Sequence, residues 1–290
     1  MSDISTIYAK DKNFPKLLKE IHLPPQLLYV RGVLKAEEHC LAVVGTRKPT
    51  RYGIEATEKI IRELAKLSNL TIVSGLATGI DTATHLGALK NNLRTIAVLG
   101  TGVDSKTIFP PQNKNLAEKI IQAGGAVISE YPEGAPGLAH HFPERNRIIS
   151  GLSLGTLIIE AKEKSGALIT ARLSLEQNRE VFCLPGSIFS SNSFGPHLFI
   201  KKGAKLVTSA EDIVEELNLP NLLEIRKEKL EILLTKEEKF ILDAISNEPL
   251  TVDEIKEKTQ FSTSGILSTL SMLELKGLVK RGDNGQWIGL

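Results

Sequence analysis

The chain has 290 residues, of which 41% are hydrophobic and 24% charged, a composition typical of a globular protein. Its 36 basic and 34 acidic residues leave a formal net charge of +2, which excludes a uniformly basic surface but not a local one. The charge is unevenly distributed, because residues 1–210 carry a net +8, residues 211–234 a net −4 and residues 235–290 a net −2. A functional interpretation therefore has to explain a basic body joined to an acidic tail.

Several classes of protein are excluded by simple patterns. No apolar run reaches the roughly 18–20 residues that a membrane-spanning helix needs, and the polar N-terminus lacks the apolar core of a signal peptide. The two cysteines, Cys40 and Cys183, fit neither a zinc site nor a disulfide framework, and no two of the six histidines have the i, i+4 spacing of helical metal ligands. We expect a cytoplasmic protein without a metal or cofactor.

The first part of the chain predicts an α/β fold. Residues 1–40 contain several prolines and indicate an N-terminal lead-in, in which residues 27–30 could form an edge strand. From residue 41 onward, short apolar runs alternate with amphipathic segments such as 52–67, a pattern typical of strands buried on both faces and joined by helices. The runs cover residues 41–44, 71–73, 95–99, 126–129, 157–159 and 180–184. Residues 41–217 therefore predict an extended Rossmann-like, doubly wound parallel sheet.

The pattern changes after this domain. Residues 218–234 indicate an acidic linker, and residues 235–290 predict three helices followed by a hairpin with its turn at residues 283–285. Thr251 with Glu254 fits a capping box before the second helix, and Ser262 caps the third. This order is that of a winged-helix domain. Its third helix holds one basic residue, Lys276, so we expect a protein-contact or regulatory module rather than a strong duplex-DNA binder.

The loops after the predicted strands are rich in small and basic residues. Ligands of an open parallel sheet bind beyond the carboxyl ends of the strands, where backbone amides and helix N-termini favour anions. A phosphate-bearing ligand is therefore expected at this edge. The candidate binding residues are Arg47, Lys48, Ser74, Gly75, Ala77, Thr78, Gly79, Arg145, Asn146, Arg147, Lys164, Ser165, Gly166 and Ser187.

Two acidic residues at the same edge raise the question of catalysis. Asp81 opens a predicted helix, where a capping role accounts for it, and Glu160 follows a buried strand. Neither lies in a context typical of a catalytic triad, and no complete nucleotide-binding fingerprint is present. We therefore predict that the protein is not an enzyme.

Several motifs in this order resemble the DNA-processing protein A family, also called DprA or Smf. They are residues 44–47 (VGTR), 74–81 (SGLATGID), 142–153 (FPERNRIISGLS), 160–161 (EA), 165–171 (SGALITA), 184–187 (LPGS) and 195–207. The resemblance covers roughly residues 14–217, together with the winged-helix tail that many members carry. In the last motif, the position of His197 is often Asn in the family.

The resemblance implies a function. Members of the family bind single-stranded DNA, form homodimers and load the RecA recombinase on incoming DNA during natural transformation. Their DNA lies over the strand-end loops, and the arginine of the Gly-Thr-Arg motif, here Arg47, contributes to binding. Local positive potential in a groove is enough to follow a phosphate backbone without reading sequence.

Two alternatives remain open. The first is an enzyme of the nucleotide phosphoribohydrolase type, which uses a similar sheet and for which Glu160 would be the candidate residue. The second is a winged-helix transcription factor with a ligand-sensing sheet domain, which would bind a specific duplex site through residues 235–290.

Overall fold

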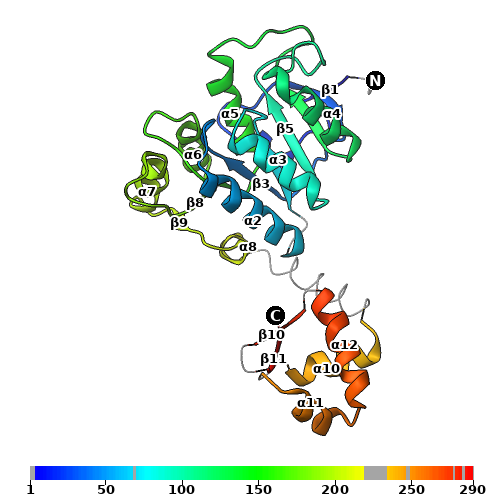
Figure 1. Ribbon diagram of the computed structural model, residues 1–290. Coiled ribbons are helices and arrows are strands. Elements are labelled where there is room, and N and C mark those ends of the chain that lie inside the picture. Colours follow the sequence, from blue (N-terminus) through cyan, green and yellow to red (C-terminus); the bar gives the residue numbers. More distant parts are fainter. Residues whose placement is uncertain are drawn as a thin grey trace. The chain divides into compact units, whose positions relative to one another are not determined.

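The computed structural model describes residues 4–67, 70–218, 234–245, 249–276, 278–282 and 285–289, and the predicted linker lies largely outside them. The chain divides into two compact units, Met1–Leu222 and Leu223–Leu290 (Figure 1). Among the described helices, none has the length and apolar content needed to span a bilayer.

The first unit is an α/β structure. Its strands are β1 (Ser5–Tyr8), β2 (Leu27–Gly32), β3 (Cys40–Val44), β4 (Thr71–Ser74), β5 (Thr95–Leu99), β6 (Ala126–Ser129), β7 (Gly155–Ile158), β8 (Glu180–Cys183) and β9 (Lys205–Leu206). Its α-helices are α1 (Lys16–Lys19), α2 (Arg51–Leu67), α3 (Ile80–Lys90), α4 (Lys114–Gln122), α5 (His141–Gly151), α6 (Ala167–Glu176), α7 (Phe194–Ile200) and α8 (Ala210–Glu216). Two 3-10 helices, η1 (Pro111–Asn113) and η2 (Ser191–Ser193), precede α4 and α7.

The strands form one sheet in the order β1-β2-β6-β5-β4-β3-β7-β8-β9. All neighbouring pairs from β6 to β9 are parallel, in agreement with the predicted doubly wound sheet. The chain builds outward from β3 to β6 and then returns to place β7 beside β3. This return makes the β3/β7 boundary the point where the strand order reverses.

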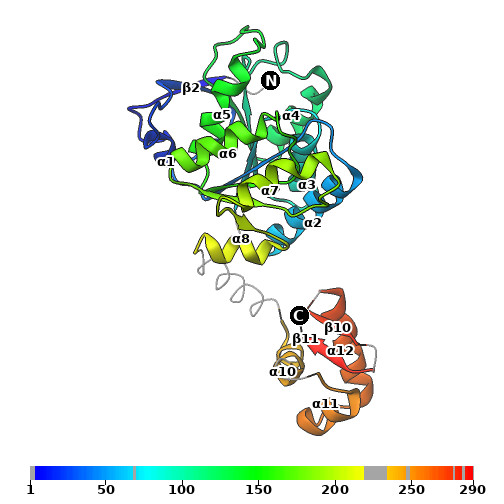
Figure 2. The same ribbon diagram turned by 90° about the vertical axis from the view of Figure 1, so that its left-hand side faces the viewer.

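Helices cover both faces of the sheet (Figures 1 and 2). Residues of β5 alternate between the two cores, because Ile96 and Val98 pack with α1, α5 and α6, whereas Ala97 and Leu99 pack with α4. This burial on both faces explains why the strands are apolar on consecutive residues.

The prediction that residues 27–30 form an edge strand is wrong. The segment forms β2, which pairs antiparallel with β1 on one side and with β6 on the other, so it lies inside the sheet. Its Arg31 is buried and forms a bidentate ion pair with Glu118 of α4, with both N–O distances at 2.9 Å. The hydrophobic pattern around residues 27–32 could not show that Arg31 would be buried, because its partner Glu118 lies far away in the sequence.

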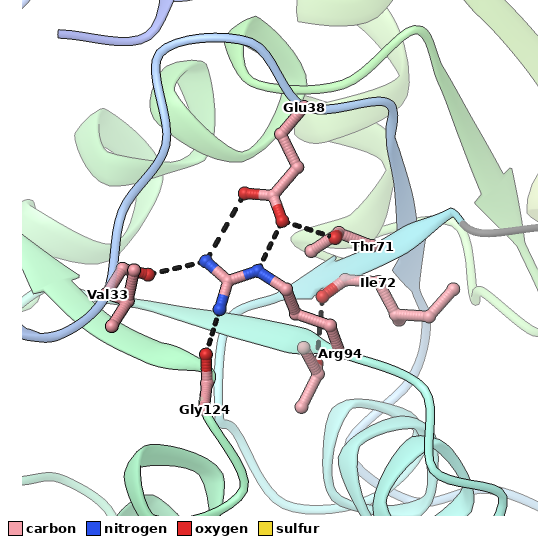
Figure 3. A network of polar contacts seen from close by, with 7 residues as sticks. Val33, Glu38, Thr71, Ile72, Arg94 and Gly124 are labelled. Atoms are coloured by element: carbon pink, nitrogen blue, oxygen red, sulfur yellow. Dashed lines mark hydrogen bonds and ion pairs between the residues drawn. The ribbon is translucent and has the colours of Figure 1, made fainter. Parts of the chain in front are cut away.

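A partly buried network joins the antiparallel and parallel parts of the sheet at the end opposite the strand-end loops (Figure 3). Arg94, directly before β5, donates to both carboxylate oxygens of Glu38 and to the carbonyl oxygens of Val33 and Gly124. Glu38 also accepts a 2.6 Å hydrogen bond from the Thr71 hydroxyl at the start of β4. The planar guanidinium and the Glu38 carboxylate together connect four separate segments.

The second unit has the predicted helix, helix, helix, hairpin order. It consists of α10 (Lys236–Ile245), α11 (Val252–Thr259) and α12 (Thr263–Leu275), followed by the antiparallel pair β10 (Val279–Arg281) and β11 (Trp287–Gly289). The capping box of Thr251 and Glu254 is present, and Ser262 caps α12. Asp283 and Asn284, at the predicted turn, lie outside the described residues.

Candidate nucleic-acid interface

A groove of about 740 Å³ opens where the strand order reverses. The helices that follow β3 and β7 lie on opposite faces of the sheet, so the loops after these strands separate and leave a crevice between them. One wall is the loop from Val44 to Arg47, and the other runs from Lys162 to Thr170. A smaller hollow of about 230 Å³, lined by Gly75, Thr78 and Phe109, shares Arg47 and Arg145 with it. We call the two together the strand-end groove.

Nine of the fourteen candidate residues border this groove: Arg47, Gly75, Ala77, Thr78, Arg145, Asn146, Lys164, Ser165 and Gly166. They come from the loops after β3, β4 and β7 and from α5, which are far apart in the sequence. The carboxyl-end rule for parallel sheets therefore located most of the candidates at one site.

The other five lie elsewhere. Lys48 is exposed beside the groove, Ser74 is fully buried and donates to the Val43 carbonyl, and Gly79 permits a turn with φ of +83°. Arg147 forms an ion pair with Glu130 and donates to the Leu23 carbonyl at 2.8 Å. Ser187 lines a separate hollow near Thr50, Tyr52 and Glu160.

An aromatic pair lies in the groove beside its most exposed arginine. The Arg47 guanidinium is 5.8 Å from the ring centroid of Phe142, within cation–π range, and the Phe142 ring is 5.7 Å from that of Phe109. Phe109, which is 46% exposed, was missed by the sequence analysis. Its position in the loop after β5 was the available signal, because that loop reaches the same edge of the sheet.

Arg145 is a buried cation under the groove. The side chain is only 5% exposed and donates to the carbonyl oxygens of Gly75, at 2.9 Å, and of Val98. Burial lowers the pKa of Arg145 to about 10, and the charge of Asp81 opposes this shift, so the group stays protonated at neutral pH. The positive charge is therefore held by backbone dipoles at the base of the groove.

The expected capping role of Asp81 is wrong. The carboxylate lies inside the first turn of α3, whose N-cap is Gly79, and accepts from the backbone N–H groups of Gly75 at 3.2 Å and Ala77 at 3.3 Å. Burial raises the pKa of Asp81, while Arg145 and these two amides lower it. Asp81 thus holds the loop after β4 in place by accepting from two of its backbone N–H groups. The sequence pattern at the start of the helix did not show that the carboxylate would bond to this loop.

Glu160, the candidate residue for a hydrolase, has a structural role. It is 4% exposed, and its oxygens accept from the backbone N–H of Thr50 at 2.8 Å, the Thr50 hydroxyl at 2.6 Å and the Asn192 amide at 3.2 Å. Thr50 directly precedes α2, so Glu160 accepts from a backbone N–H group at the start of that helix. All these contacts occupy the carboxylate, and none orients it toward a reacting group.

The chemistry available in the groove is anion binding. Four of its lining side chains are basic, namely Arg47, Arg145, Lys162 and Lys164, whereas Asp81 is acidic. In the described part of the chain, no three His, Cys, Asp or Glu side chains gather as a metal site would require. The arrangement suits a flexible polyanion, with stacking surfaces at Phe109 and Phe142.

The fold and groove define a class of proteins with a doubly wound sheet, a basic strand-end groove and a separate winged-helix unit. Residues 5–218 match the model of the family described as DNA recombination-mediator protein A, and residues 227–285 match that of the DprA winged helix domain. The chain belongs to this family.

Relatives with known names agree with this assignment. The chain is 43% identical to the DNA processing protein DprA of Bacillus subtilis over 216 residues, which cover 74% of this chain and 71% of that one. It is 42% identical to the protein Smf of Escherichia coli over 282 residues, covering 94% and 74% of the two chains. The relative from Bacillus subtilis is named for DNA processing and not for a catalysed reaction, which agrees with the prediction of a non-catalytic protein.

Two solved structures share the fold. DNA processing protein A from Streptococcus pneumoniae superposes with a TM-score of 0.69 at 43% identity, covering 74% of each chain. DNA processing protein A from Helicobacter pylori, a structure reported for its single-stranded DNA binding mode, gives a TM-score of 0.66 at 31% identity. It covers 75% of this chain and 97% of that one.

Proposed function

We propose that this protein binds single-stranded DNA in the strand-end groove and does not read its sequence. The observation that carries the proposal is the gathering of Arg47, Arg145 and Lys164 around one crevice at the switch point of the sheet. Cationic side chains at such a place neutralise backbone phosphates and release their counterions. The binding mode reported for the relative from Helicobacter pylori supports the same ligand.

The further role that we propose is loading of the RecA recombinase on DNA during uptake, by a homodimer acting in the cytoplasm. Membership of the family and the motifs shared with it support this role. It predicts that the protein shortens the lag before RecA hydrolyses ATP on single-stranded DNA covered by a single-strand-binding protein. An unchanged lag would contradict the loading role while leaving DNA binding intact.

The groove is tested by Arg47→Ala, with Arg51→Ala as the matched control. Arg47 lines the groove, whereas Arg51, four residues later, points into solvent and pairs with Glu55. We expect Arg47→Ala to weaken binding of fluorescein-labelled oligo(dT) by about tenfold or more and to reduce the salt dependence by about one phosphate contact. Fluorescence anisotropy at several NaCl concentrations measures both quantities.

The Arg51→Ala control separates the loss of a groove residue from the loss of one positive charge. Arg51→Ala removes the same charge from the same region without touching the groove, so its affinity should stay close to that of the wild type. Equal affinities for wild type and Arg47→Ala would remove the groove as the binding site.

A further inference from the structure

A cavity of about 260 Å³ lies at the end of the sheet opposite the strand-end groove. It is bordered by Cys40 at the start of β3, by Ile96 near the start of β5 and by Leu154 just before β7, so it lies at the amino ends of the parallel strands. It shares no lining residue with the groove. Close-packed cores leave few voids larger than a water molecule, so this amino-end cavity is a candidate binding site of its own.

The inner part of the amino-end cavity is apolar. Its apolar side chains are Leu17, Leu34, Cys40, Ile96, Leu152 and Leu154. All but Leu17 and Leu154 are buried. An apolar cavity of roughly 150 Å³ holds a benzene molecule in another protein. The amino-end cavity is larger, so it has room for one ring or a short aliphatic chain together with a small polar group.

Two anchored segments border this cavity. Residues 34–39 all line it, and Glu38 of this segment is bonded to Arg94 (Figure 3). The carbonyl oxygen of Ala36 accepts from the backbone N–H of Lys16 at 2.9 Å. The second segment, around Leu17, is held by Arg179, which donates to the Leu17 carbonyl oxygen at 3.0 Å. Because both segments are fixed by hydrogen bonds, the cavity is part of the fold rather than a gap between loose loops.

The rim of the cavity carries a positive charge that no acid balances by direct contact. Both carboxylates of the lining are paired, Glu37 with Lys16 and Glu38 with Arg94. Lys35 also lines the cavity, is exposed and has no hydrogen-bond or ion-pair partner among the described residues. A ligand that brings its own negative charge therefore complements this rim.

The same segment offers further hydrogen-bond donors. None of the backbone N–H groups of residues 34–39 donates a hydrogen bond to another described residue. The exposed ring of His39 likewise has no partner in the described part of the chain. Groups of this kind pair with acceptor oxygens. A carboxylate supplies such oxygens and the missing negative charge together.

We propose that the amino-end cavity binds a small carboxylic acid in its ionised form, with the apolar body of the acid beside Leu34, Ile96 and Leu152 and its carboxylate beside Lys35. The volume limits the body to one ring or a short chain. Aromatic and aliphatic acids share this chemistry. The site uses no residue of the strand-end groove, so it stands or falls independently of DNA binding.

The test uses benzoate and hexanoate as probes and benzamide as the neutral counterpart of benzoate. Each compound is titrated into the full chain at neutral pH and followed by nuclear magnetic resonance of isotope-labelled Ile and Leu methyl groups. At least one acid should bind with a dissociation constant of about 1 mM or tighter, and benzamide about tenfold more weakly than benzoate. The tighter acid shows which body fits. Absence of binding by both acids, or equal binding of benzoate and benzamide, would overturn the proposal.

The methyl signals also locate the ligand. The bound acid should shift the signals of Leu34 and Ile96, which line the amino-end cavity, and leave that of Ile169, which lines the strand-end groove, unchanged. Shifts confined to Ile169 would show that the acids bind as simple anions in the groove, and the cavity would be excluded as their site.

Lys35→Ala tests the charge, with Lys106→Ala as the matched control. Lys106 is exposed and lines neither the cavity nor the groove. We expect Lys35→Ala to bind the acid about threefold or more weakly, the scale of an exposed ion pair, and Lys106→Ala to bind it as the wild type does. Both variants should keep the thermal unfolding midpoint and the oligo(dT) affinity of the wild type. Undiminished binding of the acid by Lys35→Ala would refute the proposed position of the carboxylate.

Discussion

The imidazole of His85 lies fully buried in α3 and shows how one residue sets a pH dependence. Its Nδ1 lies 2.8 Å from the Thr95 hydroxyl, and that hydroxyl donates at 2.8 Å to the Ile72 carbonyl. Thr95 therefore accepts from Nδ1–H, so the neutral ring is the tautomer with Nε2 unprotonated. Burial, with the nearby charge of Arg145, lowers the pKa of His85 to about 3.

This shift predicts a loss of stability in acid. The unfolded chain takes up a proton on His85 below a pH of about 6.5, whereas the folded chain resists protonation until about pH 3. The contribution of His85 is thus complete above about pH 6.5 and is lost as the pH falls toward 3. Urea unfolding should give a steeper decline in this range for the wild type than for His85→Gln, by up to about 1.4 kcal/mol per pH unit.

Nuclear magnetic resonance gives an independent check in the folded wild type. The ring signals of His85 should not move between pH 8 and pH 5. A titration with a midpoint near 6.5 would show that the ring is accessible and would contradict the prediction.

Residues two positions apart can take unrelated roles on the same helix. Arg145 and Arg147 of α5 both seemed suited to the groove, yet Arg145 is buried beneath it and Arg147 pairs with Glu130 elsewhere. Successive helical positions turn by about 100°, so these two side chains leave on different sides. The structure brings this segment to the groove, but only one of its two arginines lines it.

At the scale of elements, the Arg94 network adds side-chain bonds between segments that meet at the amino ends of the parallel strands (Figure 3). It ties the connection between β2 and β3, through Val33 and Glu38, to the starts of β4 and β5 and to Gly124 before β6. The side chains of Arg94 and Glu38 are 16% and 9% exposed, so their ion pair is largely removed from water.

We expect Arg94→Ala to lower the free energy of unfolding of the first unit by about 3 kcal/mol, because the largely covered Glu38 carboxylate would lose its charged partner. Arg94→Lys should recover little, since one ammonium group cannot reproduce the planar set of donors. Far-ultraviolet circular dichroism during urea unfolding measures both variants. The exposed pair of Arg51 and Glu55 is the control, and an Arg94→Ala effect as small as that of Arg51→Ala would refute the role of the network.

At the scale of the whole molecule, the basic charge and the groove both belong to the first unit. The basic excess belongs to residues 1–210, and the groove lies entirely within the unit Met1–Leu222. In the second unit the exposed residues of α12 include Leu267, Met272 and Leu275, and its C-cap residue Lys276 donates to Glu238 of α10 at 2.6 Å. This helix therefore offers little charge to a duplex.

A chain ending at residue 218 should bind oligo(dT) within about twofold of the full chain and with the same salt dependence, because the phosphate contacts are retained. The separate segment 234–290 should show no preferred duplex site in a gel shift. A large loss of affinity on truncation would assign part of the DNA surface to the second unit, and a specific shifted band would favour the transcription-factor alternative.

The sequence by itself determined the local features of this protein. Apolar runs of three to five residues placed β3 to β8 to within about two residues, and Thr251 with Glu254 marked the start of α11. These signals depend on side-chain periodicity and capping, which act between residues close in the chain. The rule for parallel strands then located the strand-end loops at one edge.

Only the tertiary structure decided which of these loops meet and which of their charges are free. Pairing of β7 with β3 opened the groove between residues 44–47 and 162–170, and the same packing buried Arg145 while leaving Arg47 exposed. It also placed β2 inside the sheet and Phe109 beside Phe142. Strand order and burial result from contacts between residues far apart in the chain, and local sequence patterns carry no record of those contacts.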